Sequence, residues 1–206
     1  MVKPLLCFVL VAMSLLGCGG GRESGPTTAE TVTPGGSTVL VWGEGENGVV
    51  LAHGASYDAA SWEEQSRAMA DQGLAVAAVE DLSAEAVADA AGFLRAERRS
   101  TRVTLVGSSA GAAPVLDAAA SDPAIADAVV LLSPAGGDLA ALASVPVLVL
   151  YSEDESYVDG IESMVADAAE VDVETRPLPG DRHGQGIFNG DQAEVVVDAI
   201  TEVASQ

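Results

Sequence analysis

Short apolar runs alternate along most of this chain with longer segments whose apolar residues recur at helical spacing. The runs predict strands at residues 38–42, 48–52, 74–79, 103–106, 128–132 and 146–151, with a further strand at 171–175. Most are nearly continuous in apolar residues, which is typical of strands buried on both faces of a parallel sheet. The helical spacing covers residues 61–72, 83–97, 112–120, 158–169 and 192–204. The pattern therefore predicts an α/β fold, a mostly parallel central sheet with helices on both faces.

Local signals add detail to this outline. Ser61, with Glu64 three residues later, fits a capping box at the start of one helix, and Ser83 fits the N-cap of the next. The runs at 38–42 and 48–52 are joined by a short Gly-rich segment, so we expect them to be neighbouring strands.

The first residues of the chain do not share this pattern. Lys3 precedes an apolar stretch at residues 5–16, which has the length of a secretory signal and is too short to span a bilayer comfortably. The stretch ends in Leu15-Leu16-Gly17-Cys18, which resembles a bacterial lipobox, a motif whose cysteine is lipidated and becomes the mature N-terminus. A plain secretory signal or an uncleaved anchor is the alternative. Each of these takes the protein out of the cytoplasm.

Residues 19–36 are rich in Gly, Thr, Ser and Pro and show no apolar period, which is typical of a flexible tether. The sequence thus predicts a lipoprotein signal peptide at 1–17, a tether at 18–36 that starts at lipidated Cys18, and one domain at 37–206. The expected location is the cell envelope, outside the cytoplasm and anchored to a membrane. The oligomeric state stays open.

The net charge is strongly negative, at −22. Removing the predicted signal, which holds Lys3 and no acid, leaves 8 basic residues, all Arg, and 31 acidic ones, a net charge of −23. Nucleic acid is excluded as an expected partner because binding phosphates needs a basic patch. Anionic membrane surfaces should repel the domain, so we expect membrane attachment only through the lipid. The acidity is either a well-solvated surface or an adaptation to high salt.

Cysteine and histidine usage restricts the chemistry. Cys7 lies in the signal and Cys18 would carry lipid, so the mature domain has no thiol for a disulfide, a metal or a nucleophile. Two isolated histidines make a poor metal site, and the chain has no Gly-rich nucleotide fingerprint. We therefore expect no metal and no cofactor.

One pentapeptide carries candidate chemistry. Gly107-Ser108-Ser109-Ala110-Gly111 follows the apolar run at 103–106 and opens the helical segment at 112–120. In a G-x-S-x-G turn between strand and helix, the central Ser is held on a strained elbow with its hydroxyl exposed. Glycines on both sides avoid clashes where strand and helix converge. Ser109 is therefore a candidate nucleophile, whereas an ordinary Gly/Ser turn is the alternative.

Further polar residues follow other strands, and in a parallel sheet all these strand ends lie at one edge. His53 and Gly54 follow one strand, Glu153-Asp154-Glu155 another, and His183 lies after the last. The order Ser, acid, His, together with the elbow, resembles the α/β-hydrolase family from about residue 38 to the C-terminus.

The resemblance implies a role for each matching residue. Ser109 would be the nucleophile and His183 its general base, while His53 would be structural, hydrogen-bonded within its own loop. Glu155 matches the family's position for the acid, and Asp154 is the more usual residue type one position earlier; Glu155 is favoured, with Asp154 open. The backbone N–H groups of Ala55 and Ala110 would form the oxyanion hole.

Residues 135–145 leave no room for a lid domain, so we expect an open, shallow site like that of the small, dienelactone-hydrolase-like members. Tyr57, Trp62, Tyr157 and Phe188 could line it or belong to the core. The expected function is a serine hydrolase, specifically a carboxylesterase acting on small or flexible esters. An acyltransferase, a peptidase or a perhydrolase could use the same triad, and a non-catalytic surface binding module could keep the same fold.

The charge makes the first prediction. If the acidity is an adaptation to salt, the free energy of unfolding should rise from low to molar salt, because counterions screen the self-repulsion of the −23 surface. Urea denaturation in low and high NaCl measures this. A midpoint that does not change with salt would contradict the adaptation.

Overall fold

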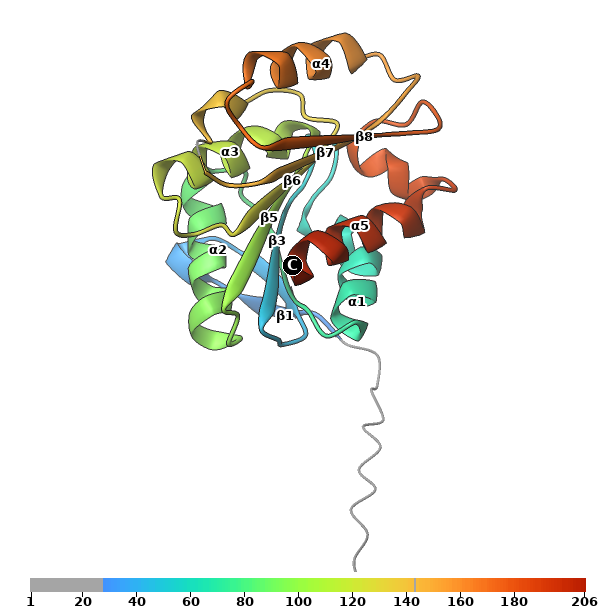
Figure 1. Cartoon of the computed structure of the whole chain (residues 1–206). Helices are drawn as coiled ribbons and strands as arrows, with labels where there is room; N and C mark the ends of the chain where they lie inside the picture. The colour runs from blue at the N-terminus through green and yellow to red at the C-terminus, as the bar shows by residue number, and fades with distance from the viewer. Residues whose placement is uncertain (1–27, 143) are drawn as a thin grey trace, which may run out of the picture.

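A computed structural model describes residues 28–142 and 144–206 (Figure 1). The predicted signal peptide, Cys18 and the first part of the predicted tether lie outside the described residues. Among the helices that are described, none is both long enough and apolar enough to cross a bilayer.

An eight-stranded sheet forms the centre of the described chain, in the order β1-β2-β4-β3-β5-β6-β7-β8. β2 pairs antiparallel with β1 and β4, and every neighbouring pair from β4 to β8 is parallel. The strands are β1 (Glu30–Val32), β2 (Val39–Trp42), β3 (Asn47–Ala52), β4 (Ala75–Val79), β5 (Arg102–Ser108), β6 (Ala128–Leu132), β7 (Val147–Ser152) and β8 (Val173–Leu178). The predicted mostly parallel sheet is confirmed.

Helices cover both faces of the sheet, with α1 and α5 on one side and α2 and α3 on the other (Figure 1). The α-helices are α1 (Glu63–Asp71), α2 (Ala84–Glu97), α3 (Ala112–Ser121), α4 (Val158–Asp167) and α5 (Ala193–Ser205). Short 3-10 helices form η1 (Pro34–Gly36), η2 (Ala59–Trp62), η3 (Ser109–Gly111), η4 (Leu139–Ala141) and η5 (Gly184–Asn189). Between β6 and β7 the described residues hold only η4 and its loops.

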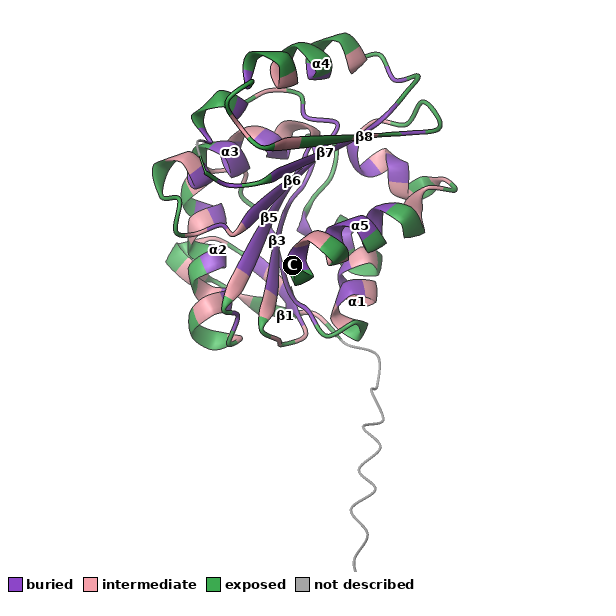
Figure 2. Ribbon diagram, viewed as in Figure 1, coloured by how far each residue is buried: buried purple, intermediate pink, exposed green. Residues whose placement is uncertain are grey.

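Two apolar layers, one on each face of the sheet, explain why the strands read as continuous apolar runs. Val50 packs with Leu94 of α2 and Leu116 of α3, whereas the next residue, Leu51, packs in the layer of α5 with Ile200. Successive side chains of a strand point to opposite faces, so a strand covered on both faces must be apolar throughout. Figure 2 shows the central strands buried over most of their length.

The two predicted helix starts have different outcomes. The Ser83 Oγ accepts the Ala86 N–H at 3.2 Å and caps α2, as predicted. The capping box at Ser61 is wrong, because the chain first turns through η2 and α1 begins at Glu63. Asp58 is the cap there: its carboxylate accepts the Ser61 N–H at 2.9 Å. A charged acceptor three residues upstream opens the turn earlier than the Ser could.

The expected pairing of the first two long strands is wrong. β4 lies between β2 and β3, pairing antiparallel with β2 and parallel with β3. All five residues of β4 are buried, so this strand needs a hydrogen-bonded neighbour on each side. Although β2 and β3 are close in the sequence, they are therefore not neighbours in the sheet.

The predicted tether ends earlier than residue 36. Residues 30–32 form β1, which pairs with β2 in the register Glu30↔Val41 to Val32↔Val39. Val32 packs against the apolar layer of α2, and the Glu30 carboxylate forms an ion pair with Arg98. The Thr-rich segment gave no apolar period because the strand is short and lies at the sheet edge, where only Val32 is partly buried.

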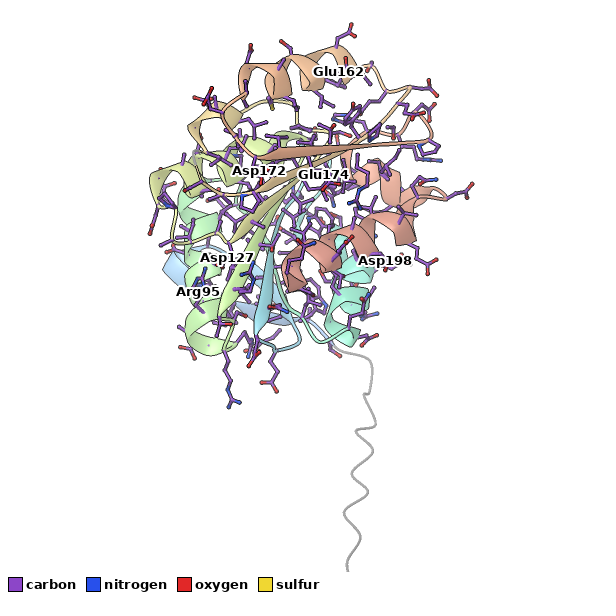
Figure 3. The ribbon with its side chains drawn as sticks, in the orientation of Figure 1. Arg95, Asp127, Glu162, Asp172, Glu174 and Asp198 are labelled. Carbon is purple, nitrogen blue, oxygen red and sulfur yellow. The ribbon has the colours of Figure 1, made fainter. Side chains whose placement is uncertain are left out.

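Charged side chains radiate from the outer elements, as Figure 3 shows for Glu162, Asp172, Glu174 and Asp198, all exposed. One labelled pair is structural instead. The Arg95 guanidinium of α2 lies 2.9 Å from the Asp127 carboxylate, which also accepts the Val103 N–H at the start of β5. Because both partners are partly exposed, this link stabilises the fold modestly.

The β1 strand makes the second prediction. A chain that begins at Ser37 loses β1 and exposes the edge of β2, so it should unfold more easily than a chain that begins at Thr28. We expect a cost of about 1–3 kcal/mol, since each net backbone hydrogen bond contributes about 0.5–1.5 kcal/mol. Urea denaturation of the two chains measures it. Equal stability would contradict the placement of β1.

Candidate active site

The turn from β5 to α3 holds Ser109 in a strained backbone conformation. Ser109 has φ 50°, a left-handed value that non-glycine residues rarely adopt and that costs about 1–3 kcal/mol. Its backbone carbonyl accepts the N–H of Ala135, which follows β6, at 3.2 Å. The surrounding fold thus holds the Ser109 side chain, which is half-buried, at the edge where the parallel strands end.

The two glycines of the pentapeptide are required by space. A Cβ on Gly107 would lie 2.7 Å from the Ala112 Cα, and a Cβ on Gly111 would lie 2.5 Å from the Ala52 carbonyl oxygen of β3. Real Cβ atoms do not approach backbone this closely. The clash expected from the sequence is therefore present, and on Gly111 the obstacle is a neighbouring strand.

His183 connects the Ser109 hydroxyl to a buried carboxylate. Its Nε2 lies 2.8 Å from the Ser109 Oγ, and its Nδ1 lies 2.6 Å from the Glu155 Oε2. The carboxylate can only accept, so Nδ1 carries the proton and Nε2 is free to accept the hydroxyl proton. The Glu155 side chain is 1% exposed and that of His183 29% exposed. This arrangement can remove a proton from Ser109 and hold it on an imidazole beside a fixed negative charge.

Asp154 points elsewhere. The N–H groups of Glu153 and Asp154 donate to the carbonyls of Leu178 and Gly180 at 2.9 Å each, which pins the chain after β7 to the end of β8. The Asp154 side chain is exposed, whereas Glu155 is buried. Of the two carboxylates left open by the sequence, the structure brings Glu155 to His183.

The two candidate oxyanion donors flank Ser109. The N–H groups of Ala55 and Ala110 have no hydrogen-bond acceptor in residues 28–142 and 144–206. Ala110 directly follows Ser109, and the loop of Ala55 approaches it closely, since a Cβ built on Gly54 would lie 3.6 Å from the Ser109 Cβ. Two free N–H groups beside a hydroxyl can bind a developing oxyanion.

His53 bonds to backbone, as predicted. Its Nδ1 lies 2.8 Å from the Gly54 carbonyl and its Nε2 lies 3.2 Å from the Glu80 carbonyl. Its ring is buried and connects the end of β3 to the end of β4.

The loop that carries His183 lies directly against the elbow. Gly184 has φ +53°, and a Cβ there would lie 2.8 Å from the Ser108 Oγ and 3.3 Å from the Ser109 Cβ. On its other side the loop is tied to β7, since the Ser152 hydroxyl donates to the Arg182 carbonyl at 2.6 Å. His183 is therefore positioned from both sides by backbone contacts.

One pKa in this region is shifted. Burial, followed by the nearby carboxylates of Glu162, Glu153 and Glu155, raises the pKa of Tyr151. Its phenol therefore stays neutral at pH values where a free tyrosine begins to ionise. No group of three or more His, Cys, Asp or Glu in the described residues could hold a metal ion.

Two tyrosines flank the candidate site. The Tyr157 ring lies 4.4 Å from the His183 imidazole, centroid to centroid, and is 50% exposed. Tyr57, 37% exposed, lies against Gly54 and Gly186. Trp62 is fully buried and packs edge-on against Phe188 at 5.6 Å, so these two rings belong to the core.

One surface cavity of the described residues lies near the candidate site. A surface cavity of about 420 Å³ lies beside the His183 loop, between Pro179 and Gln192, and does not reach Ser109. The open, shallow site that the sequence predicts from the short β6–β7 connection stays a prediction.

Gln185 is a site residue that the sequence analysis missed. It is 4% exposed, its Oε1 accepts the Gly54 N–H at 2.8 Å, and its Nε2 donates to the Ser61 Oγ at 2.9 Å. Its place two residues after His183 was the available signal, but a glutamine between glycines reads as an exposed loop residue.

Comparisons with known proteins bear on the fold of this chain. No protein-family model matches the sequence, and neither does any curated protein. Solved structures do match. A hormone-sensitive lipase from a metagenome library has a TM-score of 0.74 at 14% identity, over 87% of this chain and 84% of that one. A predicted CIB-like hydrolase from Thermoplasma acidophilum has a TM-score of 0.65 at 17% identity, over 87% and 99%.

A third similar structure is Est1E from Butyrivibrio proteoclasticus, with a TM-score of 0.63 at 14% identity over 85% of this chain and 97% of that one. These likenesses cover most of each chain at low identity. They show that this chain has the α/β-hydrolase fold.

The crowding at Gly111 makes the third prediction. Gly111→Ala should destabilise the fold by about 1–3 kcal/mol, as overpacking does, because the new methyl meets the carbonyls of Ala52 and His53. Gly92→Ala is the matched control: it lies in α2, where a Cβ meets nothing within 4 Å, and should stabilise by about 0.5–1 kcal/mol. Urea denaturation compares them. Equal effects of the two substitutions would contradict the close approach.

Proposed function

We propose that this protein is a serine hydrolase, specifically a carboxylesterase that acts on small or flexible esters. The observation that carries the proposal is the continuous hydrogen-bonded path from the Ser109 Oγ through His183 to the buried Glu155 carboxylate. The α/β-hydrolase fold, with hydrolases and a lipase among the similar structures, supports the reaction class. At such low identity this likeness is support for the fold, and the proposal rests on the geometry.

In the proposed first step, the Ser109 Oγ attacks the ester carbonyl carbon while its proton passes to the His183 Nε2. The carbonyl oxygen becomes an oxyanion, held by the N–H groups of Ala55 and Ala110. When the tetrahedral intermediate collapses, the C–O bond to the alcohol breaks, and the alcohol takes the proton from His183. Glu155 stabilises the imidazolium throughout and keeps its own charge.

In the second step, a water molecule gives its proton to His183 and attacks the acyl-Ser109 carbonyl. Collapse of the second intermediate returns the proton to the Ser109 Oγ and releases the carboxylic acid. The short β6–β7 connection supports a site without a lid, which would let water reach the acyl group and would favour small or flexible esters over a long chain that needs an enclosing tunnel. His183 thus takes up and returns a proton in both the formation and the hydrolysis of the acyl-enzyme.

The expected location is part of the proposal. The motif ending in Cys18, after an apolar stretch of signal length, supports a lipid-anchored protein outside the cytoplasm. A single lipid chain binds a membrane only marginally, so stable anchoring needs more than one acyl chain. The acidic domain then hydrolyses esters in the cell envelope.

The triad makes the fourth prediction. With p-nitrophenyl acetate to decanoate as substrates, Ser109→Ala in the full chain should reduce hydrolysis to background. Glu155→Gln keeps the shape but removes the charge that fixes the His183 tautomer, so kcat should fall by about 10²–10⁴. Asp154→Asn, one residue away and exposed, is the matched control and should change kcat less than about 3-fold.

Two results would contradict the proposal. Turnover that survives Ser109→Ala would remove the nucleophile from its role. Equal losses in Asp154→Asn and Glu155→Gln would show that the assay responds to net charge near the site and not to the bond between Glu155 and His183.

A further inference from the structure

The Gln185 amide bridges two loops whose relative position matters to the proposed mechanism. Gln185 lies at the start of η5, two residues after His183. Its partners lie on either side of Ala55: Gly54 directly precedes it, and Ser61 lies in η2, the 3-10 helix that follows the loop. A single side chain therefore connects the loop of the general base to the loop of an oxyanion donor.

The chemistry of the partners fixes the orientation of the amide. The Gly54 N–H can only donate, so the atom 2.8 Å from it must be the Gln185 oxygen. The Nε2 group then faces the Ser61 Oγ at 2.9 Å, and this hydroxyl donates in turn to the Asp58 carbonyl. The result is a series of three hydrogen bonds in which each donor and each acceptor is assigned.

The position of Gly54 makes this chain relevant to the reaction. Gly54 precedes Ala55, and its carbonyl accepts the Tyr57 N–H at 3.0 Å, which closes the turn that presents the Ala55 N–H. Gly54 is thus held at its N–H by Gln185, and at its carbonyl by the Tyr57 N–H and by the His53 Nδ1, 2.8 Å away. Ala55 itself is exposed, so its N–H is positioned through these bonds to Gly54, and Gln185 supplies the one that reaches the His183 loop.

We propose that Gln185 is a positioning residue: it fixes the position of the Ala55 N–H relative to His183, so that this N–H can bind the oxyanion of the tetrahedral intermediate. This inference rests on the proposed esterase function. Gln185 itself touches no reacting atom. Its effect is on the transition state. If the Ala55 N–H shifts by a fraction of an ångström, its hydrogen bond to the oxyanion weakens while substrate binding stays nearly unchanged.

The fifth prediction tests this role in the full chain with Gln185→Met, which keeps the length and volume of the side chain and removes both bonds. We expect kcat to fall about 10- to 100-fold with KM changed less than about 3-fold. Affinity for an alkylboronic acid, whose tetrahedral adduct on Ser109 places an oxygen in the oxyanion hole, should fall by a similar factor. Ser61→Ala removes the bond from the Gln185 Nε2 and the bond to the Asp58 carbonyl but keeps the Gly54 bond, so it should have a smaller effect on both.

A matched control separates positioning from stability. Ser100 is 3% exposed, and its Oγ donates to the Gly45 carbonyl at 3.0 Å. It lies just before β5 begins, at the other end of this strand from Ser109. Ser100→Ala should lower the free energy of unfolding and leave kcat unchanged. Hydrogen exchange of the Gly54 amide is the readout that needs no turnover, and it should accelerate in Gln185→Met and not in Ser100→Ala.

Each outcome decides the inference. Wild-type kcat in Gln185→Met would overturn it. So would a rise in KM as large as the fall in kcat, or an equal fall in kcat in Ser100→Ala. If the wild-type protein hydrolyses no ester, the esterase proposal itself is overturned. If its Gly54 amide is nevertheless protected from exchange, Gln185 has a structural role only. A loss of kcat and boronate affinity together with faster Gly54 exchange would support it.

Discussion

Three glycines let backbone segments at the end of the sheet approach one another more closely than any side chain would allow. Gly107 faces the first turn of α3, Gly111 faces the end of β3, and Gly184 faces the elbow from the His183 loop. The triad geometry depends on these approaches, because the Ser109 Oγ reaches the His183 Nε2 only when both loops lie against the same strand ends. The strained φ of Ser109 persists because its surroundings leave the elbow no room to relax.

Around this crowded centre, hydrogen bonds between loops fix the remaining degrees of freedom. The chain after β7 is pinned to the end of β8, so the Glu155 side chain turns inward while Asp154 turns outward. Ser152 and Gln185 tie the His183 loop to two different parts of the fold. The His183 loop is thereby held so that the three candidate catalytic groups lie within hydrogen-bonding distance of one another.

The fold and the centre of the site could be predicted from the sequence because they depend on strong local patterns. Continuous apolar runs indicated buried strands, and the pentapeptide around Ser109 indicated the elbow. The choice between Glu155 and Asp154 could not be settled this way, since both are carboxylates at adjacent positions and only the pairing of β7 with β8 separates them. Gln185 and β1 were missed for a related reason: their roles arise from contacts distant in the chain, which leave no periodic signal.

The proposed envelope attachment rests on a different part of the chain from the proposed catalysis, and each proposal can fail alone. The central claim is that Ser109 is an activated nucleophile. Labelling of the full chain with a fluorophosphonate, followed by mass spectrometry of the peptides, tests it most directly. The account predicts one phosphonate on Ser109 and a large loss of labelling in His183→Ala. A folded protein that takes up no label, or takes it up at another residue, would contradict the account and favour a binding module with the hydrolase fold.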